Sequence, residues 1–469
     1  MAATGLWGPT VGLAQGASQA PPPFQIQRHA EDYSYLCDRP EDAEALGPWE
    51  RLKLIPFDET CAVRLTVGGQ VRWTYEFFDN ADWGEGDQDS GGYGLWRTML
   101  HGDFWASERV RIFVGLMANH ELGREGGPRP PDENRFDVHK AFLEWHSTGG
   151  VRFRLGRQEF NYGSGRLISV REGPNSRNAF DGLRFDIPVG EWEVDIFAAR
   201  PVETDPGTLD DGAIDSRALW GVHGTRPLDG GRSLQIYYLG WENTRARFEQ
   251  GPGEELRHSL GARWARSKGH GWDYNFEAVY QFGDYDSTLA SDPSGGVRRG
   301  DISAFTVASD SGFTFGRHRL KPRLGLKVNV TSGDRDPNDP DLDTFNPLVP
   351  KGNYFGGIGL LGPYNLWDIH PSIGFRLGPK LGLLVDLVAF WRQSDDDAVY
   401  GTPGNLARGD RGSDARHIGI QPGIEVEWAV SRFFEASLVL SHFRPGRFIE
   451  ETGPSEAVTY VEFKGGFRF

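Results

Sequence analysis

Four arginines lie close together near the middle of the chain, in the stretch RLGRQEFNYGSGRLISVREG, residues 154–173. They are Arg154, Arg157, Arg166 and Arg171. A guanidinium donates two parallel hydrogen bonds to a carboxylate and keeps its charge at every physiological pH. Such a cluster fits a solvated surface, a nucleic-acid surface, or the lining of a hollow. The formal net charge of -16 argues against a nucleic-acid binder, because such proteins are usually basic.

The composition narrows the fold classes that are open to this chain of 469 residues. Glycine is abundant at 63 residues, and aromatic residues make up 13%. No run of about 18 apolar residues predicts a transmembrane helix. A closed membrane β-barrel stays compatible with the composition, because its strands expose only every second residue to lipid.

Segments of alternating apolar and polar residues follow one another from Ala62 to the C-terminus. A period of two is typical of strands with two different faces. We predict about eighteen such strands: Ala62–Phe78, Gly94–Ser107, Arg109–Asn119, Asp137–His146, Val151–Phe160, Asp181–Pro188, Trp192–Val202, Arg217–Arg226, Ser233–Asn243, Arg257–Ser267, Gly271–Phe282, Gly300–Phe313, Leu320–Thr331, Tyr364–Leu377, Leu381–Arg392, Arg416–Val430, Phe433–Phe443 and Glu456–Phe469.

The connections between these strands alternate in length. Short turns such as STGG, PLDGG and GPK alternate with long polar stretches such as DNADWGEGDQDSGGYG and HELGREGGPRPPDENRF. Outer-membrane barrels sort their connections in this way, with short turns in the periplasm and long loops outside. We therefore predict an all-β fold, a single transmembrane antiparallel β-barrel of about 18 strands over residues 62–469.

The last segment supports the same prediction. In VTYVEFKGGFRF, the apolar residues Phe463, Phe467 and Phe469 fall on one face. A final strand of this kind that ends in phenylalanine resembles the assembly signal of bacterial outer-membrane barrels. A soluble protein would leave this long apolar strand edge unprotected.

These segments together resemble the alginate-export family of bacterial outer-membrane channels. The resemblance begins at WERLKLIPFDE and VRLTVGGQVRWTYEFFDN and ends at FKGGFRF. It is densest at GGPRPPDENRFDVHKAFLEW and VRFRLGRQEFNYGSGRLISVREGPNSRNAFDGLRFD. It implies a single barrel of about eighteen strands. The best-known member passes a secreted anionic polysaccharide, alginate, through an arginine-rich lumen, but many members have no proven substrate.

The alternation assigns a face to each charged residue of the central strands. Val151, Phe153 and Leu155 are expected to face lipid, so Arg152 and Arg154 are expected to face the lumen. The face with His139, Ala141, Leu143 and Trp145 is expected to contact lipid. Further charged residues are expected in the lumen: Lys140, Glu144, Glu159, Arg184, Asp186 and Asp386.

Arg157 does not fit this pattern, because the strict alternation turns it toward lipid after Gly156. A charge that faces lipid at mid-bilayer costs about 2–4 kcal/mol. Either a bulge at Gly156 restores the inward direction, or Arg157 lies beyond the bilayer. The matching Gly-Arg-Gln arginine lines the pore in the family, so the resemblance implies that Arg157 lines the pore.

The long stretch NYGSGRLISVREGPNSRNAF follows directly and is expected to fold into the barrel mouth as a constriction. It would bring Arg166, Arg171, Glu172 and Arg177 to the solute. Fixed positive charge lowers the electrostatic cost of a carboxylate that enters a narrow pore. Two alternatives stay open: an ordinary outward loop, and arginine–carboxylate ladders that only brace a wet barrel.

The N-terminal part of the chain contains no barrel strand. Residues 1–24 resemble a remnant of a signal peptide or form a disordered tail, and residues 25–61 form a short periplasmic segment that could seal the barrel floor. Cys37 and Cys61 are the only cysteines, and both a disulfide and two free thiols are compatible with the sequence.

Motifs for metals, cofactors and catalysis are weak. Asp334, Asp336 and Asp339 offer spaced carboxylates for Ca²⁺ but lack the EF-hand glycine and glutamate, so a solvated loop is favoured. No cofactor motif occurs. Ser164 and His370 are available for an outer-membrane lipase or protease, but nothing in their spacing supports a triad.

The sequence thus predicts a passive channel of the bacterial outer membrane for an anionic polysaccharide or oligosaccharide. The alternatives are a less selective porin for small organic acids or nutrients, an outer-membrane enzyme and a soluble β-propeller lectin. The expected partners are outer-membrane lipid and lipopolysaccharide, the barrel assembly machinery, the solute and a periplasmic export partner. We expect a monomer that binds no nucleic acid.

Overall fold

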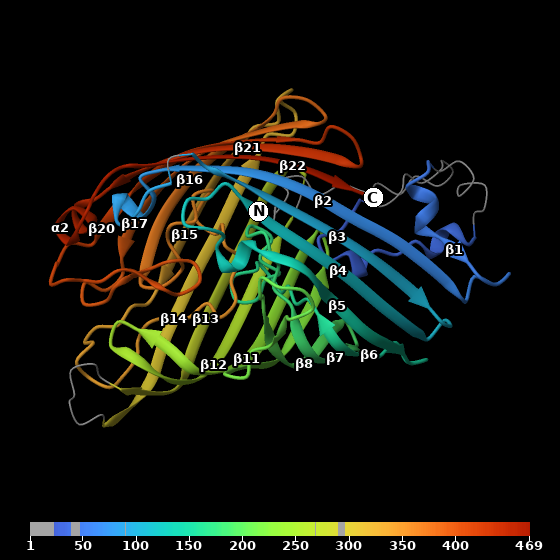
Figure 1. Cartoon of the computed structure of the whole chain (residues 1–469), viewed down its shortest axis with the longest axis horizontal. Coiled ribbons are helices and arrows are strands. Elements are labelled where there is room, and N and C mark those ends of the chain that lie inside the picture. The colour runs from blue at the N-terminus through green and yellow to red at the C-terminus, as the bar shows by residue number, and fades with distance from the viewer. Residues whose placement is uncertain (1–22, 39–46, 90, 268, 289–295) are drawn as a thin grey trace.

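A single closed β-barrel makes up most of the protein. The computed structural model describes residues 23–38, 47–89, 91–267, 269–288 and 296–469. Within these residues, eighteen antiparallel strands close into the barrel, as predicted, because the last strand pairs with the first (Figure 1). Closure leaves no free strand edge, which is the requirement for a sheet that crosses a membrane. No helix in the described ranges is long and apolar enough to cross a membrane.

The strands of the barrel wall are β2 (Arg64–Asp79), β3 (Tyr93–Trp105), β4 (Val110–Leu122), β5 (Asn134–His146), β6 (Arg152–Gln158), β7 (Phe180–Val189), β8 (Trp192–Glu203), β10 (Arg217–Leu228), β11 (Arg232–Phe248), β12 (Gly251–Arg266), β13 (Gly271–Thr288), β14 (Val297–Thr314), β15 (Arg323–Thr331), β16 (Leu366–Arg376), β17 (Leu381–Arg392), β20 (His417–Trp428), β21 (Phe434–Pro445) and β22 (Val458–Arg468). Shorter strands are β1 (Ile55–Pro56), β9 (Gly212–Ala213), β18 (Val399–Tyr400) and β19 (Leu406–Arg408). Short helices are η1 (Arg28–Ala30), η2 (Ser34–Leu36), η3 (Glu50–Lys53), η4 (Ala81–Gly84), η5 (Pro130–Asp132) and α2 (Arg447–Thr452).

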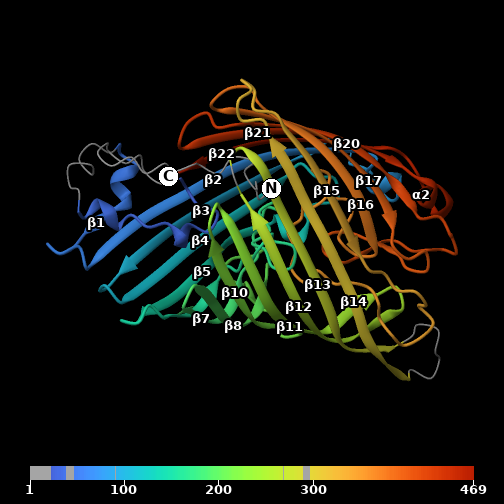
Figure 2. The ribbon, with the colours of Figure 1, turned by 180° about the vertical axis from the view of Figure 1, so that it is seen from behind.

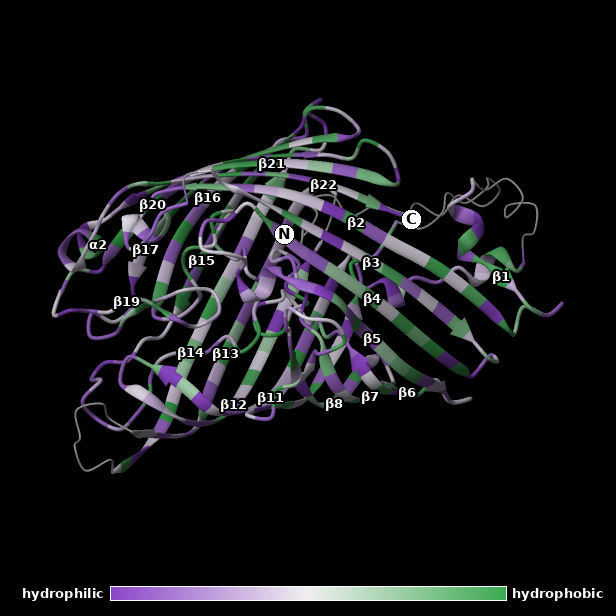
Figure 3. Ribbon diagram, viewed as in Figure 1, coloured by the Kyte–Doolittle hydropathy of each residue, from purple (hydrophilic) through white to green (hydrophobic). Residues whose placement is uncertain are grey.

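The barrel has an apolar outer surface and a polar interior. On β3, Trp96 and Leu100 are 43% and 46% exposed, whereas Arg97 between them is fully buried. The same alternation colours the strands in Figure 3, where green and purple residues follow one another along each ribbon. A soluble protein would show the reverse pattern, so the outer surface is suited to lipid.

The neighbouring strands β11, β12, β13 and β14 extend further toward the outer end than predicted. The sequence ended one strand at Asn243 and began the next at Arg257, but β11 and β12 continue to a tight connection at residues 249–250. Phe248, near the tip, packs with Tyr285 of β13 in a buried apolar cluster. This tertiary contact extends the hairpin beyond the length that the membrane requires. Figure 2 shows these strands at the front of the barrel.

Two long outer connections, residues 159–179 and 332–365, fold into the barrel and contact each other. The backbone N–H of Val349 donates to the carbonyl of Leu167 (2.9 Å), and that of Lys351 donates to Gly165 (3.0 Å). Ile168 and Phe345 belong to one buried apolar cluster with residues of the wall. The two loops therefore fill much of the interior.

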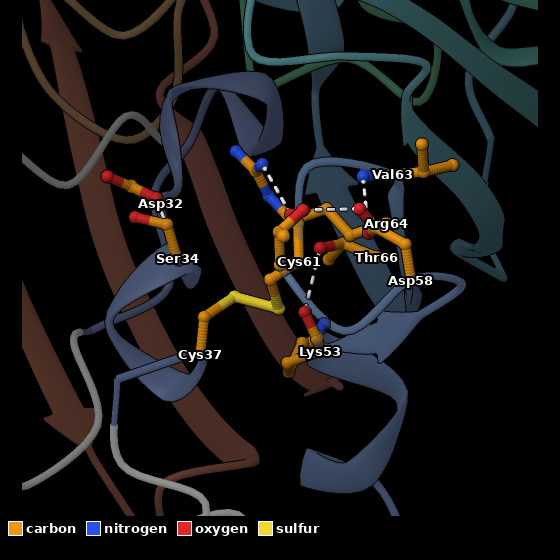
Figure 4. The surroundings of a disulfide bond; sticks show 10 residues. Asp32, Ser34, Cys37, Lys53, Asp58, Cys61, Val63, Arg64 and Thr66 are labelled. Carbon is orange, nitrogen blue, oxygen red and sulfur yellow. Dashed lines mark hydrogen bonds between the residues drawn. A yellow bond between two sulfur atoms is a disulfide. The ribbon is translucent and has the colours of Figure 1, made fainter.

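The N-terminal segment closes the opposite end of the barrel. Arg28 donates hydrogen bonds to the carbonyls of Gly69 (3.0 Å) and of the C-terminal residue, Phe469 (2.8 Å). A disulfide joins Cys37 to Cys61, just before β2, which decides the question that the sequence left open (Figure 4). Phe463 is exposed on the outer face, and Phe469 packs against Trp49.

Candidate functional site

The first group of interest is the set of charged residues that the sequence placed in the lumen on β5, β6 and β7. Arg154 donates to Glu144 (2.8 Å), and Arg111 of β4 lies 3.3 Å from the same carboxylate. Arg184 donates to Asp186 (2.6 Å) and to Asp195 (3.0 Å). Arg152, at the periplasmic end, lies 3.4 Å from Asp186. All these side chains lie on the inner face, and each cation has a carboxylate partner.

A bulge in β5 changes the face of one residue. Gly115 pairs with Lys140 and the next residue, Leu116, pairs with Val138, so His139 is an extra residue between them. His139 is buried, and its Nε2 lies 2.9 Å from Glu159. The expectation that His139 faces lipid is therefore wrong, because a bulge interrupts the alternation.

Arg157 does not have the pore-lining position that the resemblance implies. The register of β6 with β5 and β7 is unbroken across Gly156, so the bulge considered there does not occur. Arg157 pairs with Asp181 (2.8 Å), and its guanidinium donates to the backbone carbonyl of Asp211 in the outer loop (3.1 Å). It lies near the outer end of the wall on the face opposite to Arg154. The structure thus favours the second explanation, a position beyond the bilayer.

The inward loop 159–179 uses most of its charges internally. Glu159 lies between Lys140 (3.0 Å) and Arg177 (3.1 Å). Glu172 pairs with Arg177 (3.1 Å) and with Arg97 of β3. Burial by itself would raise the pKa of the Glu172 carboxyl, but Arg97, Arg177 and Arg72 outweigh it and hold that pKa well below its usual range.

The other two arginines of this loop have different surroundings. Arg166 is fully buried, donates to Asn329 of β15 (2.7 Å) and lies over the ring of Tyr354 (4.0 Å). Arg171 has a left-handed backbone (φ 54°), and no ion pair involves it within the part of the chain that the structure describes.

The N-terminal segment occupies the space beside the predicted arginines. The carbonyl of His29 accepts a hydrogen bond from Arg111 (2.6 Å), and that of Ile26 accepts one from Arg177 (3.0 Å). The imidazole of His29 packs edge-on against Phe113 and Phe142. These carbonyls take the hydrogen bonds that the arginines would otherwise offer to a solute.

An open cavity of about 420 Å³ lies on the other side of the lumen, against β11 to β21 and between the two inward loops. Its lining contains equal numbers of basic and acidic residues: Arg263, Arg266, Arg323, Lys327 and Lys351, and Asp273, Asp310, Asp386, Glu425 and Glu427. Of the charged residues that the sequence placed in the lumen, Asp386 lines this cavity, whereas those of β5, β6 and β7 and of the loop 159–179 do not.

Three cations of this cavity, Arg263, Arg266 and Lys351, lack a carboxylate partner within the described ranges. Arg263 donates to two neutral amides, Asn275 (2.7 Å) and Gln235 (3.1 Å). Lys351 contacts the ring of Tyr354 (4.7 Å to its centre), and its ammonium makes no hydrogen bond within the part of the chain that the structure describes. By contrast, Arg323 pairs with Asp273 and Asp310.

Sequence reasoning missed these residues for different reasons. The alternation in GARWAR points Arg263 inward, because Trp264 faces lipid, so this signal was present. Lys351 belongs to a long loop without periodicity, and only the contact of its backbone with Gly165 places it in the lumen.

The structure does not bring together the residues that the sequence offered for catalysis or for metal binding. His370 lies 2.8 Å from Asp386, but Ser164 donates to Glu277, and no hydrogen bond joins it to His370 in the described part of the chain. Asp334, Asp336 and Asp339 do not form a cluster of metal-ligating groups within the described residues.

The comparisons with known proteins agree with the architecture. The model of the alginate export family matches residues 63–462. The chain belongs to the alginate export family. No curated protein matches it.

Solved structures with the same fold include three crystal structures. OccAB1 of Acinetobacter baumannii is 12% identical, with 90% of this chain and 99% of that chain covered and a TM-score of 0.60. OccK3 (OpdO) of Pseudomonas aeruginosa is 11% identical, with 86% and 95% covered and a TM-score of 0.57. OccK8 (OprE) of the same organism is 12% identical, with 86% and 98% covered and a TM-score of 0.56. The barrel and the family together place this protein in the bacterial outer membrane.

Proposed function

We propose that the protein is a passive outer-membrane channel for an anionic oligosaccharide or polysaccharide, chemically similar to alginate. The observation that carries the proposal is the position of Arg263 and Lys351 at the open cavity without a carboxylate partner in the described residues. A free cation in a narrow, partly dry passage attracts a carboxylate strongly. Charge guidance therefore depends on this wall, whereas Arg154 and its neighbours brace the barrel.

A less selective porin for small organic acids or nutrients is the second candidate. Glu425 and Glu427 line the same cavity, and the two inward loops narrow the lumen. The carboxylates of Glu425 and Glu427 would weaken the binding of a polyanion and admit smaller solutes of either charge.

We propose neither an enzymatic activity nor a cofactor. The protein is expected to act as a monomer in lipid and lipopolysaccharide, after insertion by the barrel assembly machinery. A periplasmic export partner would deliver the solute.

Single channels in planar bilayers test the proposal. We expect a preference for anions in a salt gradient and a block of the current by short oligogalacturonates. Lys351→Met should weaken both, whereas Arg154→Met should lower stability and leave the anion preference in place. An unselective channel that oligogalacturonates do not block would contradict the proposal and favour the porin.

A further inference from the structure

One sector of the barrel has opposite charge at its two ends. At the short-turn end, three turns have the sequences SKGH (267–270), FGRHRLKP (315–322) and LGPK (377–380), which contain no aspartate or glutamate. The strands β13 to β16 pair consecutively, so these turns are neighbours on the rim. The backbone N–H of Arg376 donates to Leu320 (2.8 Å) and ties the middle turn to the end of β16.

The middle turn presents its cations to water. Its backbone is closed by hydrogen bonds from Phe315 to Pro322 (2.9 Å) and from Lys321 to His318 (3.0 Å). Arg317 and Arg319 are exposed. In the part of the chain that the structure describes, no ion pair neutralises Arg317, Arg319 or Lys321. In a chain with a formal net charge of -16, this is a concentrated basic surface.

The outer end of the same sector is acidic. The segment DRDPNDPDLD (334–343), which begins the inward loop after β15, contains five aspartates and one arginine. Asp336 and Asp341 are exposed. The next outer connection, after β17, adds the exposed Asp396, whereas Asp395 is paired with Arg416 and Asp397 is buried.

A path of cations joins the basic rim to the constriction. Arg323 and Lys327 lie four residues apart on the inner face of β15, directly after the basic turn. Both approach the carboxylate of Asp310, at 3.4 and 4.0 Å, and Arg323 is also paired with Asp273. Lys351 lines the same cavity beyond them. Asp273 and Asp310 balance the charges of Arg323 and Lys327, so the excess of positive charge lies in the exposed turn 315–322 and at Lys351.

We infer that the turn 315–322 captures a soluble polyanion with several carboxylates at the periplasmic mouth, and that the acidic outer loops oppose its entry from outside. The channel is then suited to export of the anionic solute, an inference that rests on the function proposed above. Steering of this kind raises the association rate on one side by about tenfold or more and is screened by salt. A passive channel cannot pump, so the polarity changes rates and leaves the equilibrium unchanged.

The test compares the two sides of one channel in a bilayer of neutral phosphatidylcholine at low salt. Short oligogalacturonates are added first to one compartment and then to the other, and the association rate of block is measured from each. We expect rates that differ by about tenfold, with the difference lost near 1 M salt. The triple variant R317Q/R319Q/K321Q should slow the faster side alone, which identifies that side as periplasmic.

Two control variants sharpen this comparison. The variant D336N/D341N should speed the slower side, because it removes the repulsion there. Arg226→Gln removes a cation at the same end but outside the sector, where Arg226 is paired with Glu191, and it should change neither rate.

Equal rates from both sides, or a triple variant that keeps the asymmetry, would overturn the inference. An asymmetry that appears only when anionic phospholipid is added would also overturn it, and would assign the basic turn to lipid headgroups. A complete absence of block from either side would instead contradict the proposed function. The two failures are therefore distinguishable.

Discussion

The side chain of His29, near the N-terminus, lies 3.1 Å from a guanidinium nitrogen of Arg154 in β6. Burial lowers the pKa of His29 well below its usual value, and the neighbouring Arg154 and Lys140 lower it further, so the imidazole is neutral and accepts this hydrogen bond. The contact places the N-terminal segment against an arginine expected to meet solute. The N-terminal segment therefore covers part of the basic wall of β3 to β7.

Release of the N-terminal segment should widen the channel. Reduction of the Cys37–Cys61 disulfide frees the segment near Arg28 and His29, while the barrel wall keeps its register between β2 and β22. We expect a higher single-channel conductance after addition of a reductant. The double variant C37S/C61S should show the higher conductance without reductant and no further response. Equal conductance in all states would show that the segment does not obstruct flow.

Loss of the Glu172 carboxylate should destabilise the inward loop. Glu172→Gln leaves Arg97 and Arg177 buried without this partner, and removal of one member of a buried pair costs about 3–5 kcal/mol. Urea unfolding in detergent measures the effect. Glu191→Gln is the matched control, because its pair with Arg226 is exposed and is worth about 1 kcal/mol or less. Similar losses in both variants would refute the structural role of Glu172.

Anion preference should fall as pH rises through neutrality. Burial lowers the pKa of Lys351 to about 7, with Lys327 and Arg166 adding to the effect and Asp310 and Glu277 opposing it. The ammonium is charged below this pKa and neutral above it. Reversal potentials at about pH 6 and about pH 8.5 should therefore show a preference for anions that decreases at the higher pH. The Lys351→Met channel should have a weak preference for anions at both pH values. A wild-type preference that does not change with pH would contradict the assignment of this pH dependence to Lys351.

Substitution of Gly156 should disrupt the wall beside Arg157. Gly156 has φ 126°, and an added Cβ would lie 2.2 Å from the carbonyl oxygen of Ala141. Gly156→Ala should destabilise the barrel by about 1–3 kcal/mol or more through backbone strain. Gly378→Ala is the control, since nothing lies within 4 Å of its Cβ position. The yield of folded barrel in outer-membrane fractions compares the two, and a normal yield for Gly156→Ala would show that the strands adjust.

The sequence by itself determined the barrel. Period-two patterning, alternating connection lengths and the final strand that ends at Phe469 are local properties, and closure of a sheet in lipid leaves few other architectures. Strict alternation also predicted that Arg154 and Glu144 lie on the inner face of the barrel, as they do in the structure. It failed at His139, where a bulge adds one residue, because a bulge has no counterpart in the hydrophobic pattern.

Only the tertiary structure decided which charges remain available to a solute. Arg154 and Arg263 both lie on inner faces, but His29 and Glu144 surround the first, while neutral amides leave the second open to the cavity. The partners come from segments that are far apart in the chain, such as residue 29 with residue 154, and residue 165 with residue 351. Pairing at such separations depends on how loops and termini pack inside the barrel, and no local pattern of residue types encodes it.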